Sequence, residues 1–298
     1  MKISLITVAY INSKCMIDLL NSIAKYNDIG NDLEVIIVDN SPDDKKIKDA
    51  IKVADYQDYI YISENNRGFG AGNNAGAKIA HGEILAFINP DIIFVEPVFA
   101  KIYEKFTDPN LALFGTQLLD ANLQPMRSFG LHFQNRFGIF SEENLWYGNR
   151  FGFYNSDEFY IEGCDLIIRK NVFEEVGSFD ENIFMYAEEL DLYKRIKKVF
   201  PQMTIKFFPD IKMVHLIGQS SATDWVTLWT RVWNSEAYVC KKHNISFKKI
   251  TEERYKNAQV RLQIAQALHY PLVEAICRNE IGICEYIMEN FIKMRHID

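Results

Sequence analysis

Hydrophobic and polar residues follow two alternating patterns over the first 90 positions. Short apolar runs predict strands, and stretches whose apolar side chains recur every three or four positions predict helices. The strands are expected at 3–9, 33–38, 59–62 and 84–88, and the helices at 13–26, 43–54 and 70–80. Alternating strands and helices indicate βαβ units and a mainly parallel sheet. The acids that follow two strands, Asp39 and Asp91, are therefore expected on one edge of that sheet.

The pattern is less regular in the rest of the chain. It predicts helices at 98–106, 171–176 and 188–199, and strands at 111–116, 159–169 and 204–208. Residues 118–158 are rich in aromatic residues and glycines and show no clear period. From position 221 onward the pattern is helical, with Pro271 as a break. We expect an α/β domain at 1–220, with halves at 1–117 and 118–220, and a helical extension at 221–298.

Charge and cysteine content narrow the classes of function. The net charge of -7 argues against nucleic-acid binding. The first 220 residues have a net charge of -9 and the remaining residues a net charge of +2. If the acidic part binds an anionic substrate, a divalent cation would be the natural bridge between the two negative charges. Five scattered cysteines without a Cys-x-x-Cys pair favour a reducing compartment. The apolar N-terminal stretch is too short for a signal peptide, and no apolar run is long enough for a membrane span.

The stretch around position 90 is the first candidate for chemistry. Apolar residues 84–88 predict a buried strand, and Pro90 ends it because proline cannot donate to a sheet. Asp91 then lies where ligands bind in open α/β sheets. The alternative is a plain turn, because Asn-Pro-Asp is also common turn chemistry.

A second candidate is the segment 65–76, which is rich in glycine and asparagine and leads into a helix. Glycines let a backbone approach a ligand, and helix N-termini attract phosphate. Gly70, Gly72 and Ala75 also match a relaxed dinucleotide fingerprint, with Asp91 as the ribose acid. That match is weak because the fingerprint normally follows the first strand of its fold. A simple glycine-rich turn is the remaining alternative.

Two further groups of polar residues remain. Glu188, Glu189 and Asp191 lie near a predicted helix start, where the helix dipole favours acids and Asp191 can pair with Arg195. In a cleft, the same acids would raise one another's pKa values, which suits proton abstraction from a hydroxyl. His215 is either a structural histidine or, with a carboxylate, a ligand for Mg²⁺ or Mn²⁺.

Taken together, these segments resemble family 2 glycosyltransferases of the GT-A fold, in particular the bacterial rhamnosyltransferase-like branch. The resemblance covers about residues 1–220 and rests on eight motifs in the family's order. They are Thr7-Val8-Ala9-Tyr10, Val38-Asp39-Asn40-Ser41, the segment 65–74, Ile88-Asn89-Pro90-Asp91, Glu162-Gly163-Cys164, Gly177-Ser178-Phe179-Asp180, Glu188-Glu189-Leu190-Asp191 and Val214-His215.

The resemblance implies a role for each matching residue. Asp91, within a variant of the DxD motif, and His215 would hold Mg²⁺ or Mn²⁺ against the donor diphosphate. Asp39 would accept a hydrogen bond from the uracil or thymine base. The donor pocket as a whole would be lined by Thr7, Ala9, Tyr10, Asp39, Asn66, Gly68, Phe69, Asn73 and Asn89.

The resemblance also implies that the acidic run supplies the catalytic base, with Glu189 as first choice, then Asp191 and Glu188. Two positions depart from the family's pattern. Asn89 stands where many relatives carry an aspartate, and Glu188-Glu189 replaces the usual Glu-Asp pair. The longer side chain moves the carboxylate by about one methylene, which leaves the base assignment open.

The implied reaction is inverting transfer of a sugar from a UDP- or dTDP-sugar to a glycan or lipid-linked acceptor in the cytoplasm. The aromatic stretch 118–154 is either an acceptor platform or ordinary core. Tryptophans and lysines at 225–242 would contact the catalytic domain, a second copy in a homodimer, or the inner face of the plasma membrane. The alternatives are a nucleotidyltransferase or dehydrogenase with a similar sheet, and an impaired relative that only binds sugar nucleotides.

Overall fold

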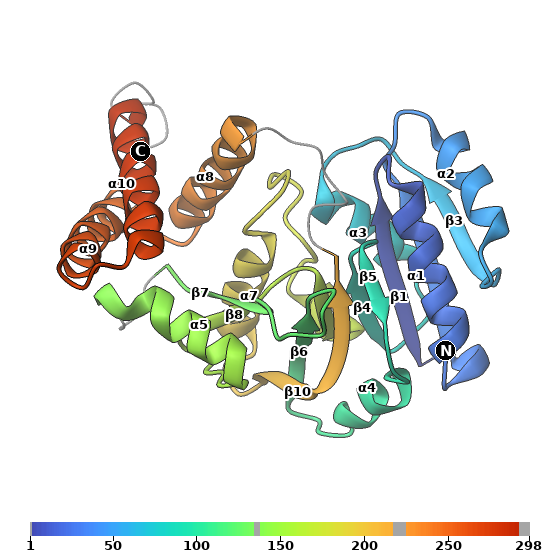
Figure 1. Cartoon of the computed structure of the whole chain (residues 1–298). Helices are drawn as coiled ribbons and strands as arrows, with labels where there is room; N and C mark the ends of the chain where they lie inside the picture. Colours follow the sequence, from blue (N-terminus) through green and yellow to red (C-terminus); the bar gives the residue numbers. More distant parts are fainter. Residues whose placement is uncertain (1, 134–137, 217–224, 292–298) are drawn as a thin grey trace.

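The computed structural model describes residues 2–133, 138–216 and 225–291, and its centre is a twisted sheet covered by helices on both faces (Figure 1). The strand order is β3-β2-β1-β4-β9-β6-β10-β5. The strands of this sheet are β1 (Ile3–Ala9), β2 (Leu33–Asp39), β3 (Tyr59–Ser63), β4 (Ile84–Ile88), β5 (Ile92–Phe94), β6 (Leu111–Leu119), β9 (Asp165–Arg169) and β10 (Thr204–His215).

Helices from both halves of the chain cover the sheet. One face packs against α1 (Ser13–Tyr26), α2 (Asp44–Ala50) and α4 (Phe99–Lys105). The opposite face packs against α3 (Phe69–Ile79), α5 (Ser141–Phe151), α6 (Lys170–Glu175) and α7 (Glu188–Val199). The described part is therefore a three-layer α/β arrangement, as the alternation of strands and helices predicts.

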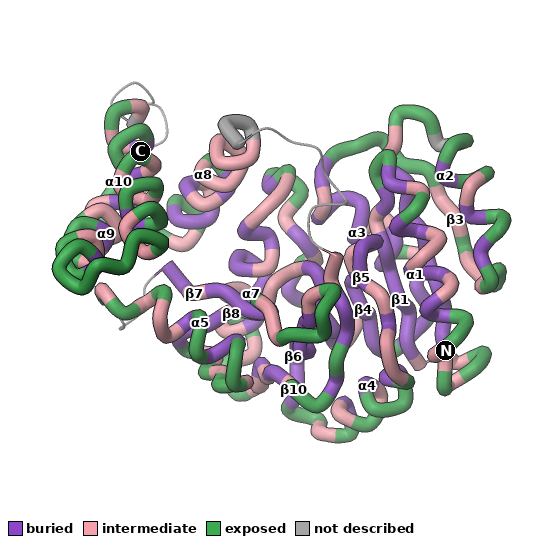
Figure 2. The backbone as a smooth tube through the Cα atoms, in the orientation of Figure 1, coloured by how far each residue is buried: buried purple, intermediate pink, exposed green. Residues whose placement is uncertain are grey.

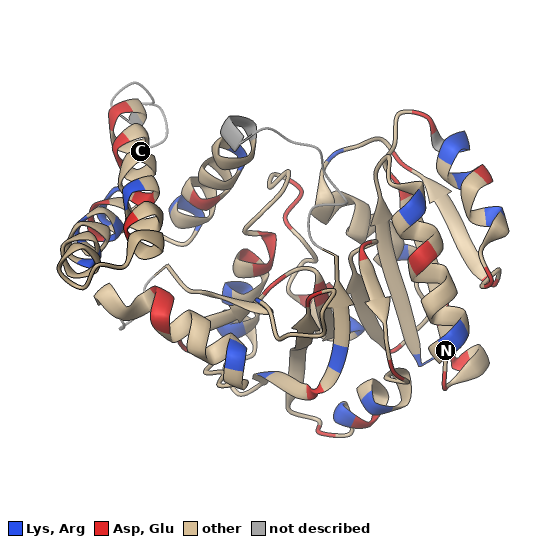
Figure 3. Ribbon diagram, in the orientation of Figure 1, with Lys and Arg blue, Asp and Glu red and all other residues tan. Residues whose placement is uncertain are grey.

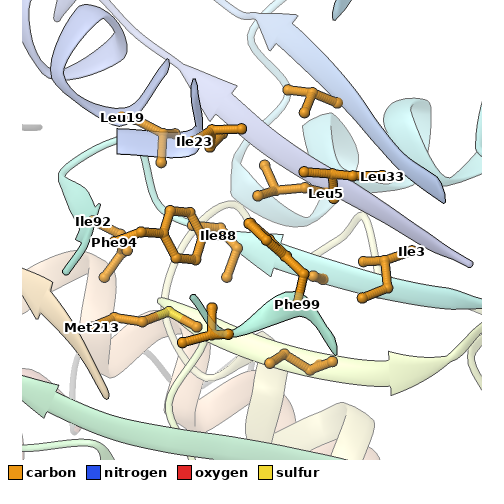
Figure 4. Close-up of a cluster of buried hydrophobic side chains, with 14 of the residues drawn as sticks. Ile3, Leu5, Leu19, Ile23, Leu33, Ile88, Ile92, Phe94, Phe99 and Met213 are labelled. Carbon is orange, nitrogen blue, oxygen red and sulfur yellow. The ribbon is translucent and has the colours of Figure 1, made fainter. Parts of the chain in front are cut away.

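Alternate residues of the central strands fill two separate cores. Ile3 and Leu5 of β1 point into the core that contains Leu19 and Phe99, whereas Ile6 belongs to the core on the other face. Figure 4 shows the first of these cores, with side chains from β1, α1, α4 and β5 meeting in one layer. Because both faces of β1, β2 and β4 are buried, these strands are mostly apolar, and β4 is apolar throughout (Figure 2).

The N-terminal half of the sheet confirms the prediction, and the second half corrects it. Strands β3, β2, β1 and β4 are parallel, so Asp39 and the residues that follow β4 lie on the same edge. Beyond β4 the sheet is mixed, because β9 runs antiparallel to both β4 and β6. Strand β10 is longer than predicted: it pairs first with β6 and, after a bulge at Phe208/Lys212, also with β5.

The stretch without clear period contains regular structure that sequence patterns did not reveal. It includes α5 and β7 (Phe129–Leu131), and β7 pairs in a small antiparallel sheet with β8 (Phe159–Ile161), just beyond this stretch. The predicted strand at 159–169 is in fact two strands, β8 and β9, in different sheets. These strands have only three and five residues, too short for a pattern of alternation to be read reliably.

Three helices follow the sheet: α8 (Trp225–Lys242), α9 (Phe247–Ala267) and α10 (Pro271–Phe291). Pro271 begins the last helix, as its position in the pattern predicts. A third core joins α7 to α8, α9 and α10. Trp233 stacks on Trp229 and makes a tilted ring contact with Tyr286. The expected boundary at 220 lies outside the described residues. None of the described helices combines the length and hydropathy that crossing a membrane requires.

Glycines let α3 lie very close to the parallel strands. A Cβ on Gly76 would stand 2.5 Å from the buried Ile6 Cγ2, and one on Gly72 would stand 2.9 Å from Val8 Cγ1. Because these two residues have no side chains, α3 can lie directly against β1 where it begins at the sheet edge.

We predict that Gly76→Ala destabilises the protein by about 1–2 kcal/mol, because overpacking against Ile6 outweighs the better helix propensity of alanine. Urea unfolding at neutral pH measures this difference. Gly282→Ala is the matched control, since a Cβ there meets no described atom within 4 Å in the middle of α10. The control should be neutral or stabilising by up to about 1 kcal/mol. A Gly76→Ala variant as stable as the control would contradict the close approach.

A buried carboxylate in β9 makes the stability of the sheet depend on pH. Asp165 is fully buried, and its Oδ2 accepts hydrogen bonds from the backbone N–H and the hydroxyl of Thr116, both at 2.7 Å. Burial raises the pKa of Asp165 to about 7, although these two hydrogen bonds act in the opposite direction.

We predict that Asp165→Asn flattens the pH dependence of the unfolding free energy. A folded-state pKa of about 7, above the unfolded value of about 4, gives stability that is complete below pH ~4 and lost as the pH rises through 7. Asparagine keeps an oxygen for Thr116 but does not titrate, so up to about 4 kcal/mol of this loss should disappear. Urea unfolding from pH 4 to 8 measures it, with the exposed Asp55→Asn as control. Equal slopes in both variants would contradict the prediction.

Candidate active site

The carboxyl ends of β1, β2 and β3 form one wall of the candidate site. Ala9 is paired with Asp39, and Asp39 with Ser63, in the parallel register. Asp39 is fully buried. Its Oδ1 accepts a hydrogen bond from the Ser41 N–H at 2.8 Å, and its Oδ2 accepts one from the Tyr61 hydroxyl at 2.5 Å. The acid is therefore fixed in orientation at the expected edge.

The segment after β1 forms the rim of this wall. The Thr7 hydroxyl is buried and has no hydrogen-bond partner among the described residues, so it can form a hydrogen bond with a ligand. The Tyr10 side chain is 40% exposed, and the neighbouring Ile11 is 64% exposed with a left-handed φ of 60°. A β-branched residue in that conformation is strained. Its backbone N–H donates to the Ser41 hydroxyl at 2.9 Å, which ties the rim to the end of β2. The sequence pattern did not identify Ile11 as a strained residue at the rim of the site.

The glycine- and asparagine-rich turn before α3 forms the next part of the site. Gly68 has a φ of 106°, and a Cβ there would lie 2.1 Å from the Phe184 carbonyl oxygen, so only glycine is tolerated. The Phe69 N–H donates to that same oxygen at 2.9 Å. Asn66 accepts from the Gly68 N–H, and the buried Asn73 donates to the Phe69 carbonyl. Both asparagine side chains thus stabilise the turn.

Asp91 and His215 come together where β4 ends and β10 finishes. Asp91 is buried, and neither carboxylate oxygen has a hydrogen-bond partner among the described residues. His215 Nε2 lies 3.3 Å from Asp91 Oδ1, and the Leu216 N–H donates to the Asp91 carbonyl. The Asn89 side-chain oxygen is likewise buried and unpartnered within the described ranges. Buried oxygens without donors are costly unless a ligand satisfies them.

This donor set agrees with a divalent cation. A carboxylate and an imidazole are ligands that Mn²⁺ accepts, and Mg²⁺ prefers the carboxylate. Over the described residues, no group of three His, Cys, Asp or Glu side chains gathers to hold a metal. The protein would therefore contribute two side chains at this position, Asp91 and His215, and leave the other positions to a ligand and water.

Glu188 and Glu189 lie in the first turn of α7, and the Glu189 carboxylate lies beside the loop 162–164. The two residues before them, Tyr186 and Ala187, both have left-handed φ values, of 73° and 65°. Glu188 is buried, and its Oε2 has no partner among the described residues. Burial raises the pKa of Glu188, and burial together with the charges of Glu188 and Glu162 raises the pKa of Glu189. Such carboxylates hold a proton more readily than exposed ones.

Cys164 connects the acidic helix turn to Asp91. Its carbonyl accepts a hydrogen bond from the Asn89 N–H at 2.9 Å. Burial raises the pKa of its thiol, and the negative charges of Asp165, Glu162, Glu189 and Asp91 add to this effect. A Cβ on the preceding Gly163 would lie 3.8 Å from Glu189 Oε2 and 3.5 Å from the Phe69 ring. The loop 162–164 therefore lies between the two sets of acids.

Asp191 has a different environment from the other two acids. It is fully buried, and its Oδ2 lies 2.8 Å from Arg195 Nε. Its Oδ1 lies 2.8 Å from both Lys242 Nζ and His243 Nε2. The predicted pairing with Arg195 is confirmed, but it is buried rather than solvated. Three basic groups therefore contact this carboxylate, whereas no ion pair is described for Glu188 or Glu189.

The aromatic stretch 118–154 divides into core and surface. Phe129 and Phe133 are buried in the cores of the protein. Trp146, Tyr147 and Phe151 lie on an exposed face of α5 with neighbouring rings 5.0 and 6.1 Å apart. Phe140 and Phe153 are also exposed, and these surface rings rather than the buried ones are accessible to a sugar or another partner.

Two named relatives are similar to this chain in sequence. The hexosyltransferase Agl10 of low-salt glycan biosynthesis in Haloferax volcanii is 23% identical over 198 residues, which cover 65% of this chain and 62% of that protein. The N-acetylglucosaminyl-diphospho-decaprenol L-rhamnosyltransferase of Mycobacterium tuberculosis is 32% identical over 65 residues, 22% of this chain and 20% of that protein. The chain thus spans less than two thirds of the length of either relative.

A solved structure shows the fold. The mannosyltransferase PcManGT of Pyrobaculum calidifontis, in complex with GDP-Man and Mn²⁺, superposes with a TM-score of 0.63 at 15% identity over 98% of this chain and 86% of that one. The architecture is therefore the GT-A fold that the sequence motifs predict. Residues 4–177, more than half of the sequence, match the family described as glycosyl transferase family 2. The chain belongs to glycosyl transferase family 2.

Proposed function

We propose that this protein is an inverting glycosyltransferase of cell-surface polysaccharide synthesis. It would move a sugar from a nucleotide-diphospho-sugar to a hydroxyl of a glycan or lipid-linked acceptor. The observation that carries this proposal is the buried Asp91, whose oxygens accept no hydrogen bond from the described residues. Its Oδ1 lies 3.3 Å from His215 Nε2, and the loop 162–164 connects its strand end to Glu189. Metal-assisted binding of a diphosphate and abstraction of a proton need these two kinds of group close together.

The donor nucleotide would lie along the ends of β1 and β2. A carboxylate can only accept hydrogen bonds, so Asp39 suits the imide N–H of uracil or thymine. Its oxygens already accept from Ser41 and Tyr61, which would fix the direction of the remaining lone pairs. The exposed Tyr10 side chain and the Thr7 hydroxyl would complete the wall, with Ala9 at the paired strand end. We therefore expect a UDP- or dTDP-sugar.

The diphosphate would lie between the turn before α3 and Asp91. Gly68 and Phe69 bring backbone close to this region, and Asn66 and Asn73 hold the turn in shape. Asp91 and His215 would hold Mg²⁺ or Mn²⁺, with Asn89 beside them. The cation supplies Lewis-acid stabilisation of the negative charge on the leaving diphosphate.

Glu189 would act as the general base for the acceptor hydroxyl. The hydroxyl oxygen attacks the anomeric carbon, the bond from that carbon to the diphosphate oxygen breaks, and Glu189 takes the hydroxyl proton. This single displacement inverts the anomeric centre and needs no nucleophile from the protein. Burial raises the pKa of Glu189, which makes its ionised carboxylate a stronger base than an exposed one. Glu188 is the second candidate.

Location and partners follow from the proposed substrates. We propose a cytoplasmic protein that reaches lipid-linked acceptors at the inner face of the plasma membrane. The C-terminal helices expose Leu268, Leu272 and Ile276. This apolar surface supports peripheral membrane contact and homodimer formation equally, and the two are separated by measuring mass in solution and binding to vesicles.

We predict that a UDP- or dTDP-sugar raises the melting temperature only when Mn²⁺ or Mg²⁺ is present. Thermal-shift measurements with UDP-, dTDP- and GDP-sugars, each with and without metal, test this directly. Asp91→Ala should remove the metal-dependent part, because it deletes the carboxylate that holds the cation. Stabilisation by NAD without metal would instead favour a dehydrogenase, and the same shift in Asp91→Ala as in the wild type would contradict the metal assignment.

We predict that Glu189→Gln keeps donor affinity but lowers the rate of transfer by about 10²–10⁴-fold, because glutamine cannot accept the proton. Donor binding is measured by calorimetry and transfer by product formation. The exposed Glu175→Gln serves as control. Transfer by Glu189→Gln within about tenfold of the wild type would place the base elsewhere, with Glu188 tested next. Donor binding without any hydrolysis or transfer in the wild type would indicate an impaired relative.

A further inference from the structure

One lysine of the C-terminal region joins the two ends of the segment that carries the acid pair. Lys242 Nζ, in the last turn of α8, lies 2.6 Å from Asp180 Oδ2 and 2.8 Å from Asp191 Oδ1. Asp180 precedes the loop that leads to α7, and Asp191 lies in the first turn of that helix. Glu188 and Glu189 lie between these two contacts. Figure 3 shows the basic end of α8 beside the acidic start of α7.

Other residues of α8 contact the same segment. The Tyr238 hydroxyl donates to Asp180 Oδ2 at 2.9 Å, and the Ser235 hydroxyl donates to the Met185 carbonyl at 2.8 Å. The Arg231 guanidinium lies over the Phe184 ring at 5.4 Å. Just beyond the helix, His243 reaches Asp191 at 2.8 Å. The loop is therefore held along much of its length by one helix.

The loop needs such support because its backbone is strained. Tyr186 and Ala187 both have left-handed φ values, and each such residue costs about 1–3 kcal/mol unless its surroundings impose it. On its other side the loop contacts the turn before α3, because the Phe184 carbonyl accepts a hydrogen bond from the Phe69 N–H. A shift of this loop would therefore move both the acid pair and the turn before α3.

Lys242 also affects the electrostatics of the acids. Glu188 and Asp191 are three positions apart on α7, so they are neighbours on its surface. Asp191 contacts Lys242, Arg195 and His243. The charges of Glu188 and Glu162 raise the pKa of Glu189, and Arg127 lowers it. Removal of Lys242 would take away a positive charge beside Asp191. Less of the negative charge of Asp191 would then be offset, which adds to the electrostatic repulsion on Glu188 and Glu189.

We propose that Lys242 is a positioning residue for sugar transfer, which fixes the segment 180–191 so that Glu188 and Glu189 face the site. This inference rests on the proposed function for its catalytic part. It makes α8 a component of the active site, although that helix lies beyond the residues 4–177 that match the family. Lys242 would touch neither donor nor acceptor and would act through Asp180 and Asp191.

The test compares Lys242→Met with Lys242→Arg and with Lys241→Met. Lys241 is exposed, adjacent and of the same charge, and no described contact links it to an acid, so it is a matched control. Lys242→Met should lower kcat by about 10–100-fold with donor KM little changed, because a small displacement of a catalytic group has effects of this size. The acidic limb of its kcat–pH profile should move to higher pH. Lys242→Arg should retain most of the wild-type kcat and most of the wild-type pH profile.

A readout that needs no activity separates this inference from the proposed function. Amide hydrogen exchange of peptides that cover 180–191 should accelerate in Lys242→Met and remain unchanged in Lys241→Met. Unchanged exchange in Lys242→Met would overturn the inference, and so would faster exchange with wild-type kcat and pH profile. A wild type that transfers no sugar would refute the proposed function, while the exchange comparison would still decide whether Lys242 holds the acid segment in place.

Discussion

The parallel pairing of β1 with β2 and β4 is the constraint on which the rest of the site depends. Parallel strands place their carboxyl ends on one edge, so Asp39 and Asp91 approach the same region although 51 positions separate them. Burial on both faces then prevents slippage, since a shift by one residue would expose an entire row of apolar side chains. The glycines of α3 keep its first turn against this edge.

The other half of the site is assembled by contacts between distant parts of the chain. Strand β10 remains paired with β6 beyond its bulge, gains β5 as a second partner, and brings His215 to Asp91. The loop 162–164 lies between Asp91 and Glu189, and α7 begins in a strained turn that α8 holds. The buried oxygens of Asp91 and Glu188 that accept no described hydrogen bond carry a cost that a bound ligand or a proton would remove, whereas packing imposes the left-handed backbone of Tyr186 and Ala187.

The three acids of α7 show how environment divides roles among similar side chains. Glu188 is buried and Glu189 is half-buried, no ion pair is described for either, and desolvation raises the pKa of both. Asp191 contacts three basic groups. The first two are suited to exchange a proton, and the third is suited to fix the helix on which they stand.

The sequence by itself determined the α/β class, the parallel half of the sheet, the helical C-terminal region and the family. These properties depend on local periodicity and on short motifs, which can be recognised without knowing distant contacts. Only the tertiary structure decided that β8 and β9 belong to different sheets, that His215 reaches Asp91, and that Asp191 is engaged by α8. Each depends on long-range contacts or on burial, and the pKa of a carboxylate is set by its neighbours in space rather than by those in sequence.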